Sequence, residues 1–193
     1  LWGTQTQLAV ENFPISGERL HPAFIRALGA VKAAAAESNL ACSALPAPVA
    51  QAITAAAGAI AEGRYADQFP VDVFQTGSGT STNMNANEVI AALASQALGQ
   101  AVHPNDHVNA SQSSNDVIPT TAHVAAAVML DQSLLPALAD LRAAIQTRVD
   151  ALGDTIKTEV KKLTTKKDKK AKKQKKKVSL EPWVVWRANG YRE

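Results

Sequence analysis

Apolar residues recur at helical spacing in two early segments of the chain. In residues 22–40 they return every three or four positions, with strong helix formers between them. The same spacing appears in residues 46–60, where Pro46 and Pro48 occupy the first turn and Gly63 follows the end. We therefore predict two helices that pair as a helical hairpin.

Two neighbouring segments lack this spacing. Residues 1–13 mix Thr, Gln and Val and end in a turn, which predicts an extended lead-in or a short strand. Residues 65–79 are polar and contain glycine, which is typical of a loop. A helix should follow this loop, beginning at Thr80 or Ser81, whose side-chain oxygens suit capping, and ending near Leu98.

A long Ala-, Leu- and Val-rich pattern covers residues 117–152. Because proline lacks a backbone N–H and crowds the preceding turn, we expect a helix start near Pro119 and a kink or break near Pro136. No run of eighteen apolar residues occurs anywhere, so no membrane span is expected. These patterns together predict an all-α protein.

The charge of the chain changes abruptly near its end. Residues 1–156 contain six Lys or Arg against thirteen Asp or Glu, a net charge of −7, whereas residues 157–193 contain fourteen against four, a net charge of +10. The pI near 9.0 therefore reflects the tail and does not indicate nucleic-acid binding by the body. Residues 159–193 are Lys-rich with little to bury, so we expect them to be disordered or extended in solution. Nucleic acid would bind only through this tail, as a polyanion.

Three polar clusters interrupt the Ala-rich background, and none of them contains Lys or Arg. They cover residues 76–85, 103–106 and 111–116. In the first, Gly77 and Gly79 let the backbone turn tightly before a helix N-terminus, where free N–H groups and the positive dipole end attract an anion. The third cluster repeats this pattern ahead of the long helix. Two helix starts that face one point could hold both ends of a dicarboxylate.

Ordinary turns and helix caps use the same residue types, so one such cluster alone would favour a purely structural role. Two dense clusters change that balance. Asn83, Asn85 and Asn87 are poor helix formers within a single predicted helix, and their presence favours a ligand network.

Metal and nucleophilic chemistry find little support in the sequence. His103 and His107 have the spacing of a metal pair, but Pro104 disfavours a helix between them and no Glu completes the pattern. No Gly-x-Ser-x-Gly elbow occurs. Cys42 is the single cysteine, which excludes an internal disulfide and fits a reducing cytoplasm. We therefore expect no metal and no cofactor.

In order and approximate spacing, the three polar clusters resemble class II fumarate hydratases of the fumarase/aspartase superfamily. The segments that carry the resemblance are Gly77-Ser78-Gly79-Thr80, Asn83-Met84-Asn85, His103-Pro104-Asn105-Asp106 and Ser111-Gln112-Ser113-Ser114-Asn115-Asp116. Residues 1–7 and 69–76 are similar too, and the likeness covers residues 1 to about 158. His103, together with Ser114 where aspartate ammonia-lyase tends to have Thr, favours fumarase over that relative.

The resemblance implies a lyase of the tricarboxylic acid cycle, which hydrates fumarate reversibly to malate as a cytoplasmic homotetramer without a metal. It implies that substrate is bound by Ser78, Gly79, Thr80, Ser113, Ser114 and Asn115. It implies a secondary dicarboxylate site formed by His103, Pro104, Asn105 and Asp106. The expected domains are a fumarase-like N-terminal helical domain (residues 1–115), the first long helix of a central bundle (residues 116–158) and a Lys-rich tail outside the family pattern (residues 159–193).

The sequence leaves the family pattern after Thr158. Fumarases of this class carry Gly-Arg-Thr-His soon after the segment that is Ile156-Lys157-Thr158 here, whereas Glu159-Val160-Lys161-Lys162 follows in this chain. The family's later serine loop and its Lys-x-Asn partner are absent as well, so no general acid–base pair is visible and the catalytic residues stay unassigned. Because Leu1 also replaces an initiating Met, we expect a truncated fumarate hydratase that is inactive alone.

Two alternatives remain open at this point. One is an ammonia-lyase of the same superfamily, and the other is a non-catalytic fragment with a polyanion-binding tail. The long Ala-rich helix would expose apolar surface if isolated, so we expect self-association or aggregation.

Overall fold

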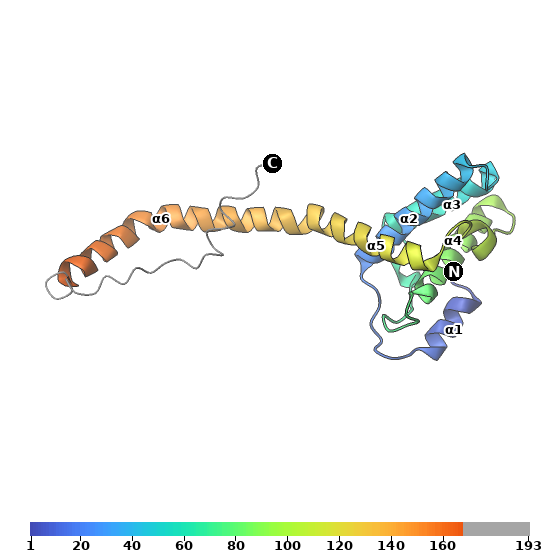
Figure 1. Cartoon of the computed structure of the whole chain (residues 1–193), viewed down its shortest axis with the longest axis horizontal. Helices are drawn as coiled ribbons and strands as arrows, with labels where there is room; N and C mark the ends of the chain where they lie inside the picture. Colours follow the sequence, from blue (N-terminus) through green and yellow to red (C-terminus); the bar gives the residue numbers. More distant parts are fainter. Residues whose placement is uncertain (168–193) are drawn as a thin grey trace. The chain divides into compact units, whose positions relative to one another are not determined.

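Helices form every regular element in the part of the chain that the structure describes. The structure is a computed structural model that describes the backbone of residues 1–167 and the side chains of residues 1–152. Its elements are α1 (Thr4–Asn12), α2 (Pro22–Ala41), α3 (Ala47–Ala61), η1 (Ala66–Gln68), α4 (Thr80–Leu98), η2 (Pro104–Val108), α5 (Ser114–Met129), η3 (Leu130–Leu134) and α6 (Leu135–Lys167) (Figure 1). η1 is a 3-10 turn, and η2 and η3 are π-helical. The predicted all-α class is confirmed.

The chain divides into two units, Leu1–Ala137 and Leu138–Glu193. All three polar clusters belong to the first unit. The first unit therefore contains everything that builds the candidate site. The predicted domain boundary at residue 115 stays a prediction.

The predicted hairpin of α2 and α3 is confirmed, and the two helices lie side by side in Figure 1. They approach closely at Gly29, where an added Cβ would lie 2.6 Å from Ala61 N and 2.8 Å from Ala57 O. Leu28 and Ile53 are fully buried in the same core. Only glycine allows this distance between the two backbones, because any Cβ would overlap the facing helix.

The first residues form helix α1, so the predicted lead-in or strand is wrong. The Glu88 carboxylate of α4 accepts hydrogen bonds from Gly3 N at 2.9 Å, Gln5 N at 2.9 Å and Thr6 N at 3.1 Å. These N–H groups surround the first turn, where no intrahelical acceptor exists. The acceptor lies at least 82 residues away in the sequence, so the local composition of residues 1–13 could not reveal it.

Helix α5 begins at Ser114, five residues before the predicted start at Pro119, which lies inside the helix. The predicted break near Pro136 is also absent, because α5, η3 and α6 follow one another without a non-helical residue. Instead, the π-helical turn η3 ends at Leu134, two residues before Pro136. A wider turn accommodates a ring that would otherwise meet the carbonyl four residues earlier.

Helix α6 ends at Lys167, nine residues into the segment that we expected to be disordered. The expectation is therefore wrong for residues 159–167. Extending an existing helix avoids the cost of nucleation, and Lys and Leu are good helix formers. The expectation for residues 168–193 lies outside the described residues.

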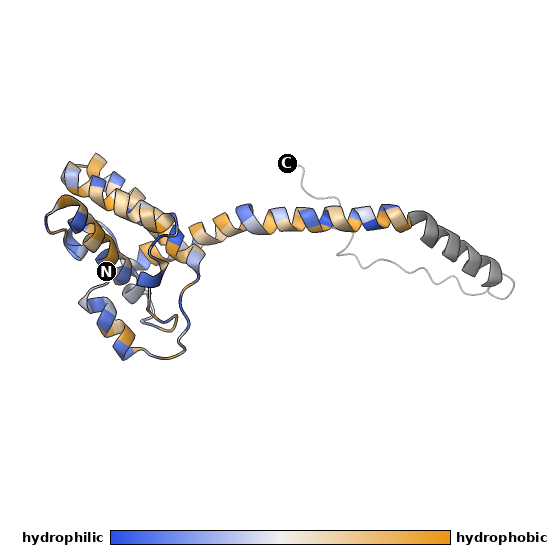
Figure 2. Cartoon of the chain, turned by 180° about the vertical axis from the view of Figure 1, so that it is seen from behind, coloured by the Kyte–Doolittle hydropathy of each residue, from blue (hydrophilic) through white to orange (hydrophobic). Residues whose placement is uncertain are grey.

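The helical stretch Ser114–Leu152 is long and apolar enough to cross a membrane by length and composition, with a mean hydropathy of 1.4 in its most apolar window. Its apolar residues nevertheless follow one stripe. Leu134, Leu138, Leu141 and Ile145 recur every three or four residues and are about half exposed, between 48% and 55%. Polar residues alternate with them along the helix (Figure 2). Such a stripe is typical of a helix that packs against other helices.

Candidate functional site

Gly79 brings the starts of α4 and α5 together. It is the N-cap of α4 in the left-handed conformation, with φ +68°, and an added Cβ would lie 3.0 Å from Ile118 Cγ2 of α5. One turn along α4, Asn83 Nδ2 donates a hydrogen bond to Ser114 Oγ at 2.9 Å. The first and third polar clusters, which lie far apart in the sequence, therefore form two adjacent helix starts.

The cap of α4 comes from Gln75, so the predicted capping by Thr80 or Ser81 is wrong. Gln75 Oε1 accepts from Thr82 N at 2.9 Å, which satisfies the third N–H of the helix. The N–H groups of Thr80 and Ser81 donate to no acceptor in the described part of the chain. The hydroxyls of Ser78 and Thr80 lie 2.7 Å apart beside them. These donors can receive an anion.

Ser113 and Ser114 shape the start of α5. Ser113 is the N-cap, and its Oγ accepts from Asn115 N at 3.3 Å. Ser114 is half-buried and accepts from Asn83, so its own hydroxyl hydrogen can be donated to a further acceptor. The residues that the resemblance assigns to substrate binding accordingly lie at these two helix starts: Ser78, Gly79, Thr80, Ser113, Ser114 and Asn115.

The second cluster, residues 103–106, forms a separate exposed turn in η2. His103 Nδ1 accepts from Asp106 N at 3.2 Å and lies 3.2 Å from Asp106 Oδ2, while His103 N donates to His107 Nδ1 at 2.9 Å. Pro104 occupies the first position of η2, where its missing N–H costs nothing. The expectation that Pro104 would disfavour a helical turn here is therefore wrong. Among the residues searched, no three His, Cys, Asp or Glu side chains form a metal-binding group.

A buried lysine, which sequence analysis did not assign to the site, is linked to both helix starts. Lys32 of α2 is 0% exposed, and its Nζ donates to Asn109 Oδ1 at 3.0 Å and to Gln112 Oε1 at 2.8 Å. Asn109 Oδ1 also accepts from Asn83 Nδ2 at 3.1 Å. Because Asn83 also donates to Ser114, a continuous set of hydrogen bonds joins Lys32 to Ser114.

Burial lowers the pKa of Lys32 from 10.5 to about 7, because the ammonium loses its hydration. No carboxylate pairs with it among the side chains of residues 1–152. The sequence did carry a signal for this position. Lys32 follows Leu28 by four residues and precedes Ala36 by four, and both neighbours are buried, so Lys32 lies on the apolar face of α2.

Of the three asparagines in α4, only Asn83 takes part in this network. Asn83, Asn85 and Asn87 are all at most 1% exposed, and the Oδ1 of each has no partner in the described part. Asn85 Nδ2 instead donates to Gln68 O at 2.9 Å and so fixes η1 against α4. Asn85 therefore has a structural contact of its own, and Asn87 Nδ2 lies 3.6 Å from Met84 Sδ, so only Asn83 is hydrogen-bonded to the start of α5.

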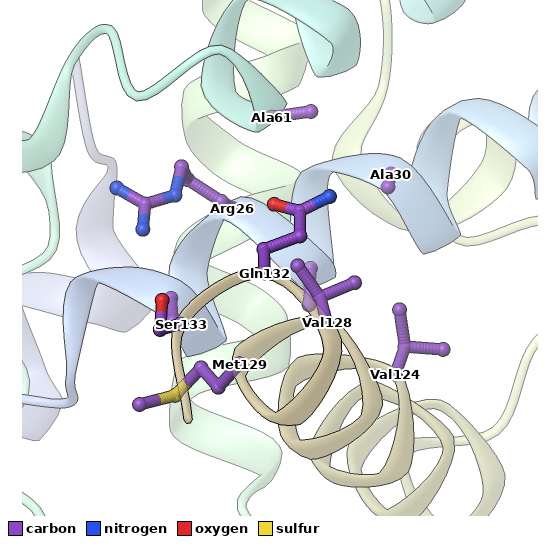
Figure 3. A pocket seen from close by; sticks show the side chains of 10 residues that line it. Arg26, Ala30, Ala61, Val124, Val128, Met129, Gln132 and Ser133 are labelled. Carbon is purple, nitrogen blue, oxygen red and sulfur yellow. The ribbon is translucent and has the colours of Figure 1, made fainter. Parts of the chain in front are cut away.

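Two cavities adjoin these elements. One of about 220 Å³ borders the loop before α4 and is lined by residues that include Gln75, Thr76, Gly79 and Ile118. A larger one, of about 360 Å³, lies among α2, α3 and α5–η3, with Arg26 and Gln132 set among Ala and Val side chains (Figure 3). The larger cavity shares no residue with the polar clusters. The smaller cavity is thus the one that belongs to the candidate site.

The profile of a protein family described as "Lyase" matches residues 1–163 of the chain. The chain belongs to this lyase family. The lyase chain is 56% identical to a class II fumarate hydratase from Xylella fastidiosa over 158 residues, which cover 82% of this chain and 33% of that protein. A class II fumarate hydratase from Corynebacterium glutamicum is 52% identical, with the same coverage of 82% and 33%. The resemblance to class II fumarate hydratases is therefore confirmed.

Solved structures give the same result for the lyase chain. Recombinant class II fumarase from Schistosoma mansoni matches with a TM-score of 0.75 and 33% identity over 78% of this chain and 33% of that one. A fumarate lyase:delta crystallin from Brucella melitensis matches with a TM-score of 0.65 and 50% identity over 68% of this chain and 31% of that one. The lyase chain spans about one third of the length of the curated relatives it matches.

Proposed function

We propose that the chain supplies the substrate-recognition part of a fumarate hydratase, which adds water reversibly to fumarate to give malate. The observation that carries this proposal is the pair of adjacent helix starts linked by the hydrogen bond from Asn83 to Ser114. Free N–H groups and hydroxyls gather there, and they suit the two carboxylates of a small dianion. The identity to class II fumarate hydratases adds support.

The chemistry explains why such donors matter. In the direction from malate to fumarate, a base removes the proton from the carbon next to one carboxylate, and negative charge develops on that carboxylate before hydroxide leaves the neighbouring carbon. The N–H groups of Thr80 and Ser81 and the hydroxyl of Ser114 can stabilise this charge, because preorganised donors act most strongly where charge develops. In our proposal these residues bind and orient the substrate and perform no proton transfer themselves.

The proton-transfer groups would have to come from outside residues 1–158, since the Gly-Arg-Thr-His and serine-loop segments of the family are not in this sequence. We therefore expect the isolated chain to bind dicarboxylates without turning them over. Fumarate absorbance should stay constant when fumarate is incubated with the purified chain. Hydration by the isolated chain would contradict this expectation.

A complementation experiment tests the function itself. The chain is mixed with the remaining two thirds of the Xylella fastidiosa enzyme, and the loss of fumarate absorbance is followed. Hydration should appear only in the mixture and should fall at least tenfold with Ser114→Ala. Arg26→Met, an exposed change on α2, serves as the control. Release of ammonia from aspartate without hydration of fumarate would favour an ammonia-lyase of the same superfamily.

We propose further that the chain acts in the cytoplasm as part of a homo-oligomer, a tetramer by analogy with the family. The apolar stripe on α6 supports assembly, because half-exposed Leu138, Leu141 and Ile145 have no cover within the described residues. Packing of several such helices would bury this stripe. Sedimentation of the purified chain would reveal the assembly directly.

The exposed turn at residues 103–106 is proposed as a secondary dicarboxylate site. Its exposed His103 and Asp106 lie at the surface, and no hydrogen bond joins the turn to either helix start within the described part. Binding there should thus be separable from binding at Ser114. His103→Ala should remove one of two binding events in a titration with malate and leave the other.

A further inference from the structure

Lys32 is the only lysine in residues 1–156, and it is completely buried. A buried ammonium without a counter-ion is unfavourable, so its presence calls for a physical explanation. Its two hydrogen-bond partners, Asn109 and Gln112, are neutral amides. These neutral partners accept from two of the three N–H groups of the ammonium and leave its charge uncompensated.

We propose that Lys32 is a positioning and specificity-determining residue for a dianionic ligand. In this proposal the ligand's carboxylates compensate the charge of Lys32, and the hydrogen bonds of Lys32 orient the groups that present the Ser114 hydroxyl. The inference rests on the proposed function, because its ligand is the dicarboxylate bound at the starts of α4 and α5. It adds a positive charge to a site whose three polar clusters contain neither Lys nor Arg.

The charged form of Lys32 determines which group donates in each hydrogen bond between Lys32 and Ser114. An ammonium only donates, so Asn109 must present its carbonyl oxygen to it. That oxygen also faces Asn83, which must then present its NH₂ group to both Asn109 and Ser114. Ser114 Oγ consequently accepts, and its hydrogen is left for an acceptor outside the network. A neutral amine could also accept, so loss of the proton from Lys32 would remove this constraint.

No other charge in the described part compensates Lys32. The further titratable side chains on α2, on the helices in contact with α2, and on the neighbouring η2 and α4 are Arg26, Glu37, Glu88, His103, Asp106, His107, Asp116 and His123. None of them makes a hydrogen bond or an ion pair with Lys32, and α3 has no titratable residue. Burial is accordingly the only cause that lowers the Lys32 pKa.

This arrangement couples ligand binding to a proton. Without ligand, Lys32 has a pKa of about 7 and is largely neutral one pH unit higher. A nearby dianion stabilises the charged form and raises the pKa, so that binding takes up a proton. The affinity of the chain for the dianion should therefore fall as the pH rises above the pKa that Lys32 has without ligand.

Nuclear magnetic resonance on the full chain with labelled lysine tests the proposal. The Lys32 Cε resonance is followed against pH without ligand and with saturating succinate, a non-reacting dicarboxylate. We expect a midpoint near the free pKa of about 7 without succinate and a midpoint at least one pH unit higher with it. All other lysines lie at or beyond Lys157, so sequential assignment separates Lys32 from them.

Calorimetry provides the second measurement. One pH unit above the free pKa, titration of succinate into the chain in buffers of different ionisation enthalpy should show uptake of about 0.4 protons for each succinate bound if the midpoint rises by one unit, and of up to about 0.9 protons if it rises further. Lys32→Met should abolish this uptake and weaken binding at least tenfold. Arg26→Met removes an exposed charge from the same helix and should change neither quantity.

The outcomes separate the two proposals. If succinate shifts the Thr80 and Ser114 amide resonances while the Lys32 midpoint stays unchanged, the role of Lys32 is refuted and the proposed function stands. If succinate binds nowhere at any pH, the proposed function fails, and the role of Lys32 fails with it. The wild-type titration alone decides between these outcomes, even if Lys32→Met does not fold.

Discussion

Lys32 should make the stability of the folded chain depend on pH in a way that Lys32→Met removes. The folded pKa is about 7 and the ordinary value is 10.5. Between these values the unfolded chain binds more protons than the folded chain, so stability increases with pH. The full difference in pKa corresponds to about 5 kcal/mol at most, and the gain from pH 7 to pH 9 is about 2 kcal/mol.

Urea denaturation, followed by the helical circular dichroism signal, measures this slope. The free energy of unfolding of wild type is compared with that of Lys32→Met and of Arg26→Met at several pH values from about 6 to about 9. Titratable groups that behave alike in wild type and in the variants contribute equally to each free energy of unfolding, so their contributions cancel when the values are subtracted. Wild type and Arg26→Met should gain about 2 kcal/mol over the upper two pH units, and Lys32→Met should lack this gain.

The prediction concerns how the free energy of unfolding changes with pH and not its absolute value, because the absolute stability of Lys32→Met has two opposing contributions. Methionine removes a buried charge, but it also leaves Gln112 Oε1 without its donor, which costs about 1–3 kcal/mol. Equal pH slopes in wild type and Lys32→Met would refute the reasoning. They would mean that water or a relaxed side chain hydrates the ammonium in the folded chain.

Three further predictions follow from contacts elsewhere in the first unit and on α6. Gly29→Ala should destabilise the chain by about 1–3 kcal/mol, because the added Cβ would meet the α3 backbone. Gly58→Ala should stabilise the chain by about 0.5–1 kcal/mol, because the added Cβ would meet nothing within 4 Å and alanine is the better helix former. Thermal unfolding of the two variants and wild type measures both effects. Glu88→Ala should cost about 1–3 kcal/mol and speed amide exchange in α1, and unchanged exchange there would refute its capping role. Leu141→Lys should weaken self-association in sedimentation experiments, while Thr147→Lys on the opposite side of α6 should not; equal effects would argue against the stripe.

The helices whose limits depend on local sequence were predicted well. Residues 22–40 and 46–60 correspond closely to α2 and α3, because apolar spacing and the first-turn prolines determine these limits locally. The start of α5 was misplaced because proline was treated as the strongest signal. The side chain of Ser113 caps the helix six residues before Pro119, which the helix then accommodates in its interior.

The candidate site was predicted in part for the same reason. Its glycines, serines and threonines are local markers of helix starts, so the sequence indicated the start of α4 and a polar cluster ahead of the long helix, although the start of α5 itself was placed too late. Their adjacency could not, since it depends on the contact between Gly79 and Ile118. Lys32 was missed because its partners lie 77 and 80 residues away in the sequence. Only the fold shows that the amide side chains of Asn109 and Gln112 reach this charged residue on the apolar face of α2.

The capping of α1 by Glu88 also determines the order in which parts of a newly made chain can become ordered. The segment that forms α1 leaves the ribosome before its acceptor, which is synthesised at least 82 residues later. Short helices without a cap or tertiary contact are marginal in water. The first turn of α1 must therefore wait until α4 exists, so α1 becomes ordered no earlier than a helix that is synthesised long after it.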